Sequence, residues 1–514
     1  MNLGGNYSED PVADILACLR QKGVRLWTEG GQLRYRAPRG SLDDRELQSL
    51  KAHREGLVAR VAHEEGNGPR QAPLTFSQRA HWNRYRLWVQ TAIRQIPAAI
   101  RLRGRLQVDS LKRALHKLVS RHEALRTRII VKAGEPWQEV LPHLDLELPI
   151  EDLSGLTSAL QANEVQRAIE QLIMEPLDIG VGPLFSGRLL KLGEREHVLL
   201  LAMEHIISDA FSMGIARYEL LELYARAVSE VSEELPAPRV QFPDFARRQR
   251  EMHASWIAKH GTYWDKCLQE WPRVRFPDDP SVVPGQTGWG SVAIHIDNSL
   301  KQELMLWCRS RGTTLVMGVF AAYAVVVLQW CQVTQCAIQY VHDGRNKPGT
   351  EKTIGFFAST VYVCAQLRES DRFSDFLGRL IENYYQASVH DDAFYLEAQV
   401  PVPEFTRNAA FNWIPQGSQE EMPLLEGSEF ELTCGAVPFE HPLVTRLERD
   451  AEPALVFYDR VEEATGNLIF PRNRFSSAQM ERFAGHVLTC LRAMVGPSHR
   501  LLREIPFPGR ASDV

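Results

Sequence analysis

The stretch LLLAMEHIISDAFSM, residues 199–213, joins a strand pattern to a helix pattern through a short polar segment. Its apolar run is typical of a buried strand, and a helical pattern begins directly after Asp209. His205 stands where the strand gives way to the loop. An imidazole there can face a cleft, and its pKa of about 6.5 suits it to take a proton from a hydroxyl or an amine. By itself the spacing also fits an exposed histidine beside an aspartate that caps a helix.

Strand and helix patterns alternate on both sides of this stretch, which predicts a mixed α/β protein with two halves of similar size. Residues 108–131 read as a helix running into a strand, further helical patterns occupy residues 158–178, 209–229 and 477–495, and strand patterns occupy residues 197–204, 335–341, 409–414 and 454–459. The segment 315–328 is apolar on every side but shorter than the roughly 18 to 20 residues of a membrane span. With Thr313 and Thr314 ahead of it as a cap, it is predicted to be a buried helix.

The first sixty residues read as a small unit of their own. Residues 11–23 and 41–62 have helical apolar spacing, and residues 24–38 form two alternating runs around Gly30 and Gly31, a hairpin signal. The polar stretch HEEGNGPRQAP, residues 63–73, is rich in glycine and proline and predicts a linker between domains.

Composition narrows the class of protein. The net charge of -5 does not favour nucleic acid, and the local cluster RLRGRL, residues 101–106, is interpreted as a solvated face. The eight cysteines are scattered without metal or redox spacing, and residues 1–10 lack the pattern of a signal peptide. We therefore expect a reduced, cytoplasmic protein that holds no metal and binds neither nucleic acid nor a membrane.

Eight short motifs follow one another in a fixed order along the chain. They are PLTFSQRAHWNRYRL (73–87), RHEALRTRI (121–129), EPLDIGVGPLFSGRLLKL (175–192), EHIISDAFSM (204–213), FPDFARRQR (242–250), YWDKCL (263–268), TIGFFASTV (353–361) and AAFNWI (409–414). Together they resemble the ordered core motifs of the condensation domains of nonribosomal peptide synthetases, over residues 73–500.

This resemblance implies a fold of two lobes, related to chloramphenicol acetyltransferase, with an active-site tunnel between them. We expect a docking domain at residues 1–63, a linker at 64–73, an N-terminal lobe at 74–245 and a C-terminal lobe at 246–514. The family motif HHxxxDG maps its catalytic histidine onto His205. Its aspartate maps onto Asp209, where a structural role is implied through an ion pair with an arginine of the other lobe. Arg345, in VHDGRNKPG, is the candidate partner.

The chain departs from the family motif at two positions. Glu204 stands in place of the first histidine and Ala210 in place of the glycine. Neighbouring side chains of a strand point to opposite faces, so Glu204 is expected to be structural rather than a second base, and it is also counted among the possible substrate contacts. Ala210 requires an ordinary backbone conformation. Ser212 and Asn412 are further candidates for substrate contacts, for which a helix-turn hydroxyl and a strand-end amide are equally open alternatives.

The N-terminal unit resembles the β-hairpin docking domains of tubulysin-type synthetases, mainly over GVRLWTEGGQLRYRAPRG, residues 23–40. In that family the hairpin edge receives the C-terminal tail of an upstream carrier protein as an added strand. The residues expected to contact the tail are Arg34, Arg36, Arg39, Trp27 and Tyr35. The alternatives are a solubilising surface for the arginines and a place in the small core for Trp27.

The two resemblances imply an acyltransferase that takes a polyketide or peptidyl chain from the phosphopantetheine thioester of a carrier protein. That arm comes from the partner, so no cofactor of the chain itself is expected. Only the short segment 496–514 follows the last helix pattern. The layout resembles chain-releasing enzymes of hybrid polyketide pathways, such as the ester-forming enzyme of enacyloxin assembly, and favours ester formation on a free small-molecule acceptor. Amide formation between two carrier-bound substrates and a non-catalytic docking platform are the alternatives.

Overall fold

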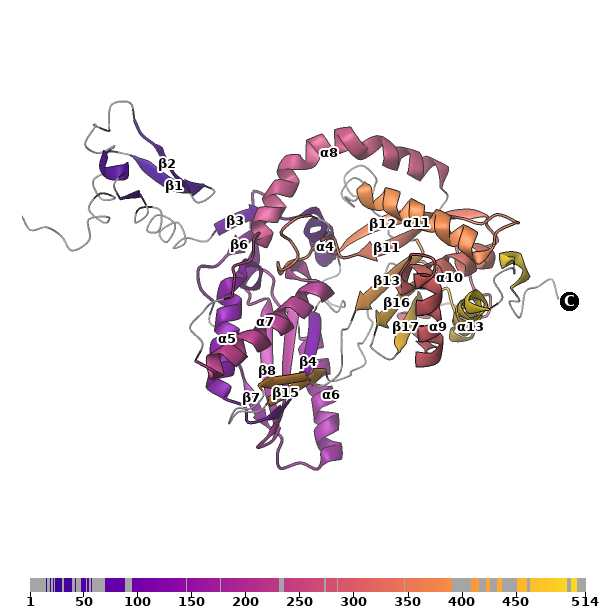
Figure 1. Ribbon diagram of the computed structural model, residues 1–514, viewed down its shortest axis with the longest axis horizontal. Coiled ribbons are helices and arrows are strands. Elements are labelled where there is room, and N and C mark those ends of the chain that lie inside the picture. The colour runs from indigo at the N-terminus through magenta and orange to yellow at the C-terminus, as the bar shows by residue number, and fades with distance from the viewer. Residues whose placement is uncertain are drawn as a thin grey trace, which may run out of the picture. The chain divides into compact units, whose positions relative to one another are not determined.

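Figure 1 shows the computed structural model of the chain, which divides into two compact units. Residues 1–71 and 139–144 form the first unit, and residues 72–138 and 145–514 form the second. The structure describes residues 15, 19, 22, 24–29, 32–38, 42, 48–51, 53, 54, 57, 70–87, 95–144, 146–175, 177–230, 235–271, 274–283, 285–345, 347–390, 408–415, 422–425, 432–436, 451–459, 463–496 and 501–505.

The first unit contains the predicted hairpin. Strands β1 (Arg25–Glu29) and β2 (Gln32–Arg36) pair antiparallel, with Trp27 opposite Arg34 and Leu26 opposite Tyr35. Leu26 and Leu33 pack on a small core of buried residues, which are Leu19, Val24, Leu50 and Leu57. Because side chains alternate along a strand, Trp27, Arg34 and Arg36 share the hairpin face that points away from this core.

A six-stranded sheet in the order β14-β15-β4-β9-β8-β7 organises the first half of the second unit. Its strands are β14 (Met422–Leu425), β15 (Leu432–Ala436), β4 (Gln95–Gly104), β9 (Glu196–Glu204), β8 (Phe185–Gly193) and β7 (Ile150–Asp152). The central strand β9 is buried from His197 to Glu204, which explains its continuous apolar sequence. Strands β14 and β15 come from the C-terminal part of the chain, and β15 pairs antiparallel with β4.

Three amphipathic helices pack around this sheet: α5 (Val108–Arg121), α6 (Ser158–Met174) and α7 (Ala210–Val228). The apolar face of α6 covers β4, β8 and β9 in one buried cluster. Helices α5 and α7 are joined through the buried carboxylate of Glu219, which contacts His122 and Arg121, each at 2.7 Å. The RHEALR motif therefore builds the packing between these helices. Arg101 and Arg103 on β4 both pair with Glu196 of β9 at the surface, where Arg103 and Arg105 are exposed, in agreement with the expected solvated face.

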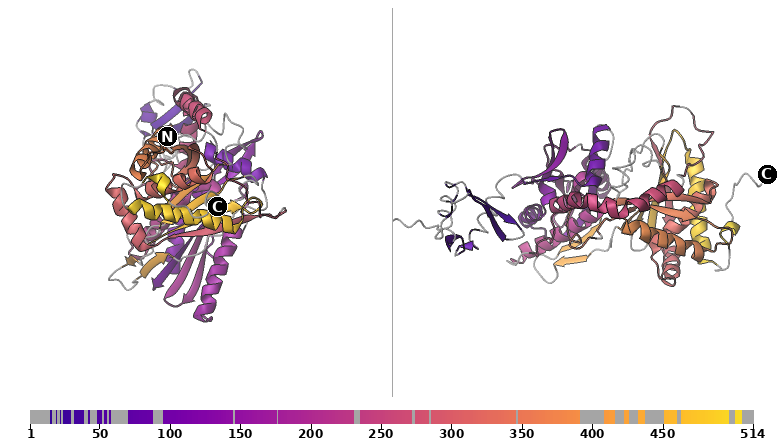
Figure 2. Two further views of the ribbon diagram at one scale, coloured as in Figure 1. Left: turned by 90° about the vertical axis from the view of Figure 1, so that its right-hand side faces the viewer. Right: turned by 90° about the horizontal axis from the view of Figure 1, so that it is seen from above.

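A second six-stranded sheet, in the order β10-β17-β16-β13-β11-β12, organises the other half. Its strands are β10 (Trp289–Ile296), β17 (Ala464–Pro471), β16 (Ala454–Asp459), β13 (Ala410–Pro415), β11 (Gln335–His342) and β12 (Ser359–Gln366). Its helices are α9 (Asn298–Arg309), α10 (Leu315–Trp330), α11 (Phe373–Val389) and α13 (Ser477–Val495). Helix α13 packs on β10 and β17, and the left view of Figure 2 shows it lying across that part of the sheet.

Helix α10 is the apolar segment for which a buried helix is predicted from the sequence, and this prediction is confirmed. Every residue from Met317 to Leu328 is buried, and the Thr314 hydroxyl accepts a hydrogen bond from the Met317 amide at the helix start. Within the described part of the chain, no helix combines the length and the apolar character that crossing a bilayer requires.

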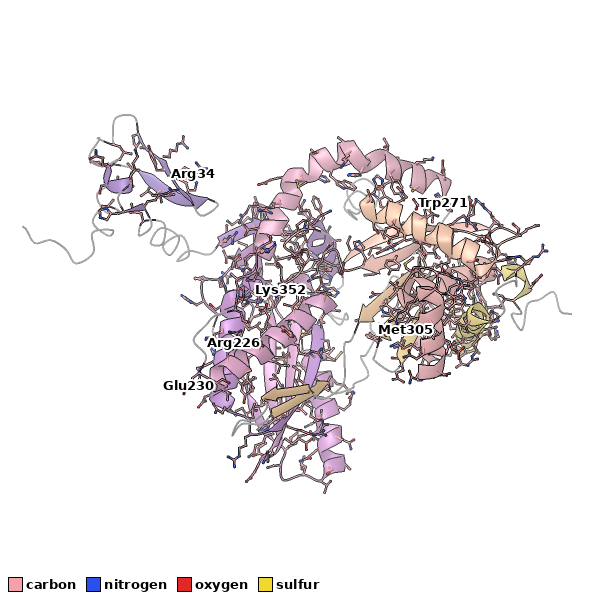
Figure 3. The ribbon with its side chains drawn as sticks, viewed as in Figure 1. Arg34, Arg226, Glu230, Trp271, Met305 and Lys352 are labelled. Atoms are coloured by element: carbon pink, nitrogen blue, oxygen red, sulfur yellow. The ribbon has the colours of Figure 1, made fainter. Side chains whose placement is uncertain are left out.

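The long helix α8 (Phe242–Glu270) contributes to both halves of the second unit. Near its N-terminus, the Gln241 side chain accepts a hydrogen bond from the Glu123 amide of the first half. Further along, the Trp264 indole donates to the carbonyl of His390, which follows α11. Figure 3 labels Trp271 at the C-terminal end of this helix. The helix thus links the packing of both sheets within one unit.

The shorter elements of the chain are β3 (Arg70–Pro73), α4 (Phe76–Leu87), η1 (Glu123–Arg126), β5 (Thr127–Lys132), β6 (Glu135–Val140), η2 (His205–Ile207) and η3 (Leu502–Glu504). Strand β3 lies inside the segment 64–73, for which a linker is expected from the sequence. This part of the segment is ordered because Ala72 is buried and Gln71 donates a 2.8 Å hydrogen bond to Glu139. The expected lobe boundary at 245 and 246 lies inside α8. The domain limits drawn from the sequence remain predictions.

Candidate active site

The segment 204–212 turns from strand β9 through the short helix η2 into helix α7. The turn is fixed at both ends by side-chain caps. The Glu204 carboxylate accepts a hydrogen bond from the Ile206 amide, and Asp209 accepts one from the Ser212 amide at 2.7 Å. Ala210 is the first residue of α7 and takes a helical conformation, so the site does not need the glycine of the family motif there.

His205 is held in one orientation by its Nδ1 atom, which lies 3.0 Å from the carbonyl oxygen of Ser208. A carbonyl oxygen only accepts, so Nδ1 carries the hydrogen and the lone pair of the neutral ring is on Nε2. Desolvation by burial lowers the pKa of His205, and the neighbouring His81 lowers it further. At neutral pH the ring is therefore an uncharged base whose Nε2 atom can accept a proton.

Asp209 is a buried brace rather than a partner of His205. Its Oδ2 atom accepts hydrogen bonds from Arg345 at 2.8 Å and from the amides of Phe357 and Ala358 at 3.0 and 3.1 Å. With the cap on Ser212, the carboxylate is hydrogen-bonded at both oxygens. These contacts join α7 to the loop between β11 and β12, on which Figure 3 labels Lys352.

Arg345 occupies the other side of this contact, as expected from the resemblance. Its side chain is 3 % exposed, and its Nη1 atom forms the ion pair with Asp209. The guanidinium also lies over the rings of Phe211 and Phe357, at 4.7 and 4.5 Å from their centroids. A buried guanidinium held by a carboxylate and two aromatic faces ties the two sheet systems together at the site.

Ser212 belongs to the same contact, which corrects its place among the expected substrate contacts. Its hydroxyl donates to the Gly355 carbonyl at 2.7 Å and accepts from the Gly355 amide at 3.0 Å and from Arg345 at 2.8 Å. The hydroxyl is fully buried and has no hydrogen-bonding position left for a substrate. The structure thus favours the helix-turn alternative for this residue.

Two glycines bring the loop of Arg345 close to the rest of the site. Gly344 has a φ of +65°, and a Cβ atom there would lie 1.9 Å from the carbonyl oxygen of Phe357. At Gly355 a Cβ would lie 2.1 Å from the ring of Phe242, at the start of α8. Both positions exclude larger side chains, so VHDGR, FPDF and TIGFF meet at one point of the structure.

Gln78 brings the first motif to the same place. Its side-chain amide donates to the carbonyl of Ile206 at 2.8 Å, and its oxygen accepts from the amide of Thr75 at 2.9 Å. The buried glutamine therefore anchors helix α4 to the turn that carries His205.

Glu204 is 1 % exposed, which argues against a direct substrate contact and agrees with the structural role expected for it. Asn412 lies on β13, paired with Val341 of β11 and Val456 of β16. Among the described residues no contact joins Asn412 to His205, so its proposed substrate contact stays a prediction. In the part of the chain that the structure describes, no group of three or more His, Cys, Asp or Glu side chains is arranged to hold a metal ion.

Two rings beside His205 were not identified from the sequence. His81 of α4 lies 5.4 Å from His205 between ring centroids, and Phe356 lies 4.6 Å from it. Both residues fall inside quoted motifs, but nothing in their spacing indicates that their rings meet. Pairing residues 81, 205 and 356 requires the fold.

The expected docking residues lie on the hairpin of the first unit, where Figure 3 labels Arg34. Arg34, Tyr35 and Arg36 are exposed, and Trp27 is partly buried on the face that carries the two arginines. This face is opposite the small core, so Trp27 is not one of the core residues. Arg39 lies outside the described residues.

Comparison with known families gives two matches that together cover most of the chain. Residues 69–512 match the model described as Condensation domain, and residues 12–59 match the model described as TubC N-terminal docking domain.

Among curated proteins, the chain is similar to parts of two much longer synthetases. It is 28% identical to the malpibaldin synthetase of Mortierella alpina over 429 residues, which are 82% of this chain and 8% of that protein. It is 28% identical to the chondramide synthase of Chondromyces crocatus over 426 residues, which are 82% of this chain and 11% of that protein. The chain thus spans about a tenth of the length of either relative.

Among solved structures, the chain shares its fold with SgcC5 of Streptomyces globisporus, with a TM-score of 0.68, 22% identity, and coverage of 84% of this chain and 100% of that one. It also superposes on a condensation domain described as mediating chain release from the enacyloxin polyketide synthase. That match has a TM-score of 0.65 and 19% identity, and it covers 95% of this chain and 98% of the other.

Proposed function

Because this chain belongs to the condensation-domain family and carries a docking domain of the TubC type, we propose that it transfers an acyl chain from a carrier protein to a hydroxyl or amine acceptor. The observation that carries the proposal is the state of His205. The ring is neutral, fixed through Nδ1, and has its Nε2 lone pair available as a base.

The proposed reaction is a substitution at the thioester carbonyl of the phosphopantetheine arm. The acceptor oxygen or nitrogen forms a bond to the carbonyl carbon while His205 Nε2 takes its proton. Collapse of the tetrahedral intermediate then breaks the carbon–sulfur bond, and the imidazolium returns the proton to the leaving thiolate. The Asp209–Arg345 brace keeps the ring in place while the reactants are held in line.

For the acceptor, we propose a free small molecule with a hydroxyl group, so that the acyl chain leaves the carrier protein as an ester of this molecule. The support is the likeness to the enacyloxin chain-release domain, which extends over 95% of this chain. Amide formation between two carrier-bound substrates is the second candidate, and the similarity to the malpibaldin and chondramide synthetases favours it. One neutral base serves either nucleophile, so the histidine does not choose between them.

For the donor, we propose that the upstream carrier protein docks through its C-terminal tail on the hairpin of the first unit. A tail that adds a strand there would meet the exposed Arg34 and Arg36, with Trp27 on the same face. This arrangement suits an acidic tail with apolar residues between its charges. Arg39 is proposed as a further contact from its place in the sequence.

The experiment that tests this function is intact-protein mass spectrometry of an acyl-loaded carrier. The carrier is incubated with the protein and with soluble hydroxylated acids, soluble amines, or a second loaded carrier. Loss of the acyl group to a soluble hydroxyl acceptor supports ester-forming release, and transfer only between carriers supports the second candidate. If no acyl group is transferred to any of these acceptors, the enzymatic function is contradicted, and a non-catalytic docking platform is the remaining candidate.

A further inference from the structure

His81 and His205 present their rings to the same place from different elements. His81 comes from α4 and His205 from the end of β9, and their centroids are 5.4 Å apart. Phe356, from the loop after β11, packs against both rings, at 4.6 Å from His205 and 5.8 Å from His81. His81 keeps 20 % of its side chain exposed, so the pair is partly open to solvent.

Glu204 supplies a buried carboxylate next to His81. Its Oε2 atom accepts from the Ile206 amide, but its Oε1 atom is buried and has no hydrogen-bond partner among the described residues. The Nε2 atom of His81 lies 3.8 Å from Oε1. A buried carboxylate oxygen without a hydrogen-bond partner is costly, and a protonated imidazole at this distance lowers that cost.

The position of Glu204 gives this contact a functional meaning, because family members carry the first histidine of their motif there. In this chain an acidic residue at 204 and a histidine at 81 face each other beside the catalytic position. Besides His81, the charges of Glu204 and Asp209 act on the ring of His205, and the charge of Asp209 is compensated by Arg345.

We propose that His81 and Glu204 form a charge pair that sets the protonation state of His205. The Glu204 carboxylate lies where it can act as the counter-charge of a protonated His81, and an imidazolium at residue 81 disfavours a second positive charge on His205. His205 therefore stays a neutral base to lower pH than it would alone. His81 acts through His205 and is a positioning residue. Its role in acyl transfer rests on the proposed function, whereas the charge pair itself does not.

The test follows the titration of His205 by NMR in protein labelled with 13C-histidine, with the His205 signal assigned from the spectrum of H205A. Replacing His81 with glutamine removes the charge but keeps a polar side chain. In H81Q the midpoint of the His205 titration is expected to rise by about one pH unit. In H81K, which keeps a positive charge, it is expected to stay within about 0.3 units of the wild type. The matched control is H116Q, because His116 is exposed on α5 and contacts only its own helix, at Lys112.

The same variants are then assayed for acyl transfer across pH. The acidic limb of the rate profile is expected to move with the NMR midpoint in H81Q and to stay in place in H81K and H116Q. An unchanged His205 midpoint in H81Q, or an equal shift in H81K, would overturn the charge pair. If the His205 midpoint shifts in H81Q but the wild type transfers no acyl group, the proposed function is contradicted and the charge pair is supported. Failure of the charge pair and failure of the proposed function therefore give different results.

Discussion

The Asp209 carboxylate accepts four hydrogen bonds: the one from Ser212 caps α7, and those from Arg345, Phe357 and Ala358 tie the turn of His205 to the loop of Arg345. His205 is instead oriented by the carbonyl of Ser208. The histidine and the aspartate of the motif thus perform different tasks. One is available for proton transfer, and the other stabilises the contact that positions it.

Replacing Asp209 with asparagine tests the structural role of this residue. Asparagine still caps α7, but it leaves the buried guanidinium of Arg345 without its counter-charge. The free energy of unfolding, measured by chemical denaturation, is expected to fall by about 3 to 5 kcal/mol. The matched control is E164Q, which breaks the exposed pair of Glu164 and Arg167 on α6 and should cost no more than about 0.5 kcal/mol. Equal losses in the two variants would refute the role of Asp209 as a brace.

The pH dependence of acyl transfer tests the role of His205 as the catalytic base. Burial lowers the pKa of His205 from 6.5, and the base works only when it is unprotonated. Activity should therefore be level near neutral pH and decline on the acidic side, with a midpoint below 6.5. A plot of kcat/KM against pH for a small thioester mimic measures this midpoint. A midpoint above that of an ordinary histidine would contradict a neutral, desolvated base.

At this scale the sequence predicts His205, Asp209 and Arg345 because the ordered motifs and their resemblance assign roles to these positions. It does not predict that the Ser212 hydroxyl already makes all the hydrogen bonds it can, or that His81 contacts Glu204. Both depend on which side chains meet across segments separated by more than a hundred residues, as in the bond between Ser212 and Gly355.

At the scale of elements, the turn after β11 decides where Arg345 lies. Gly344 combines a φ of +65° with a backbone oxygen 1.9 Å from the position of a Cβ atom. The turn can therefore approach Phe357 only with glycine, and the approach brings Asp209 within reach of the same loop.

Substituting alanine at Gly344 is expected to lower the free energy of unfolding by about 2 to 3 kcal/mol or more and to reduce acyl transfer. Gly312 is the matched control, since it has a φ of +66° with nothing within 4 Å of its Cβ position. G312A carries only the cost of the left-handed backbone, about 1 kcal/mol. Thermal or chemical unfolding measures the difference, and an equal cost in both variants would show that the close approach to Phe357 has no energetic weight.

Elements with strong local patterns were predictable, and those made by distant pairing were not. Helix α10 has an apolar run and a threonine cap, and β9 is a continuous apolar strand, so both follow from their own sequences. The pairing of β15 with β4 joins residues 432–436 to residues 100–104, and no local pattern indicates it. Strand β3 is likewise hidden in a polar stretch, since its order comes from burial of Ala72 and the contact between Gln71 and Glu139.

At the scale of the whole molecule, the first unit is compact by itself and folds around its own small core. Deleting residues 1–65 should therefore raise KM for the cognate loaded carrier by about tenfold, a loss of about 1.4 kcal/mol in binding, and spare a small thioester mimic. Charge reversal in R34E/R36E should produce the same pattern without a deletion, more strongly at low salt. Equal loss with carrier and mimic would contradict docking on the hairpin.

The most direct test of the central claim is a single-turnover measurement of acyl transfer from the loaded carrier, comparing wild type with H205A by intact-protein mass spectrometry. His205 is partly buried in a turn whose bracing contacts come from Asp209 and Arg345, so the alanine variant should fold as the wild type does. The account predicts that the carrier is emptied by the wild type and that H205A is slower by a factor of about 10² to 10⁴. Transfer by H205A at the wild-type rate would contradict it.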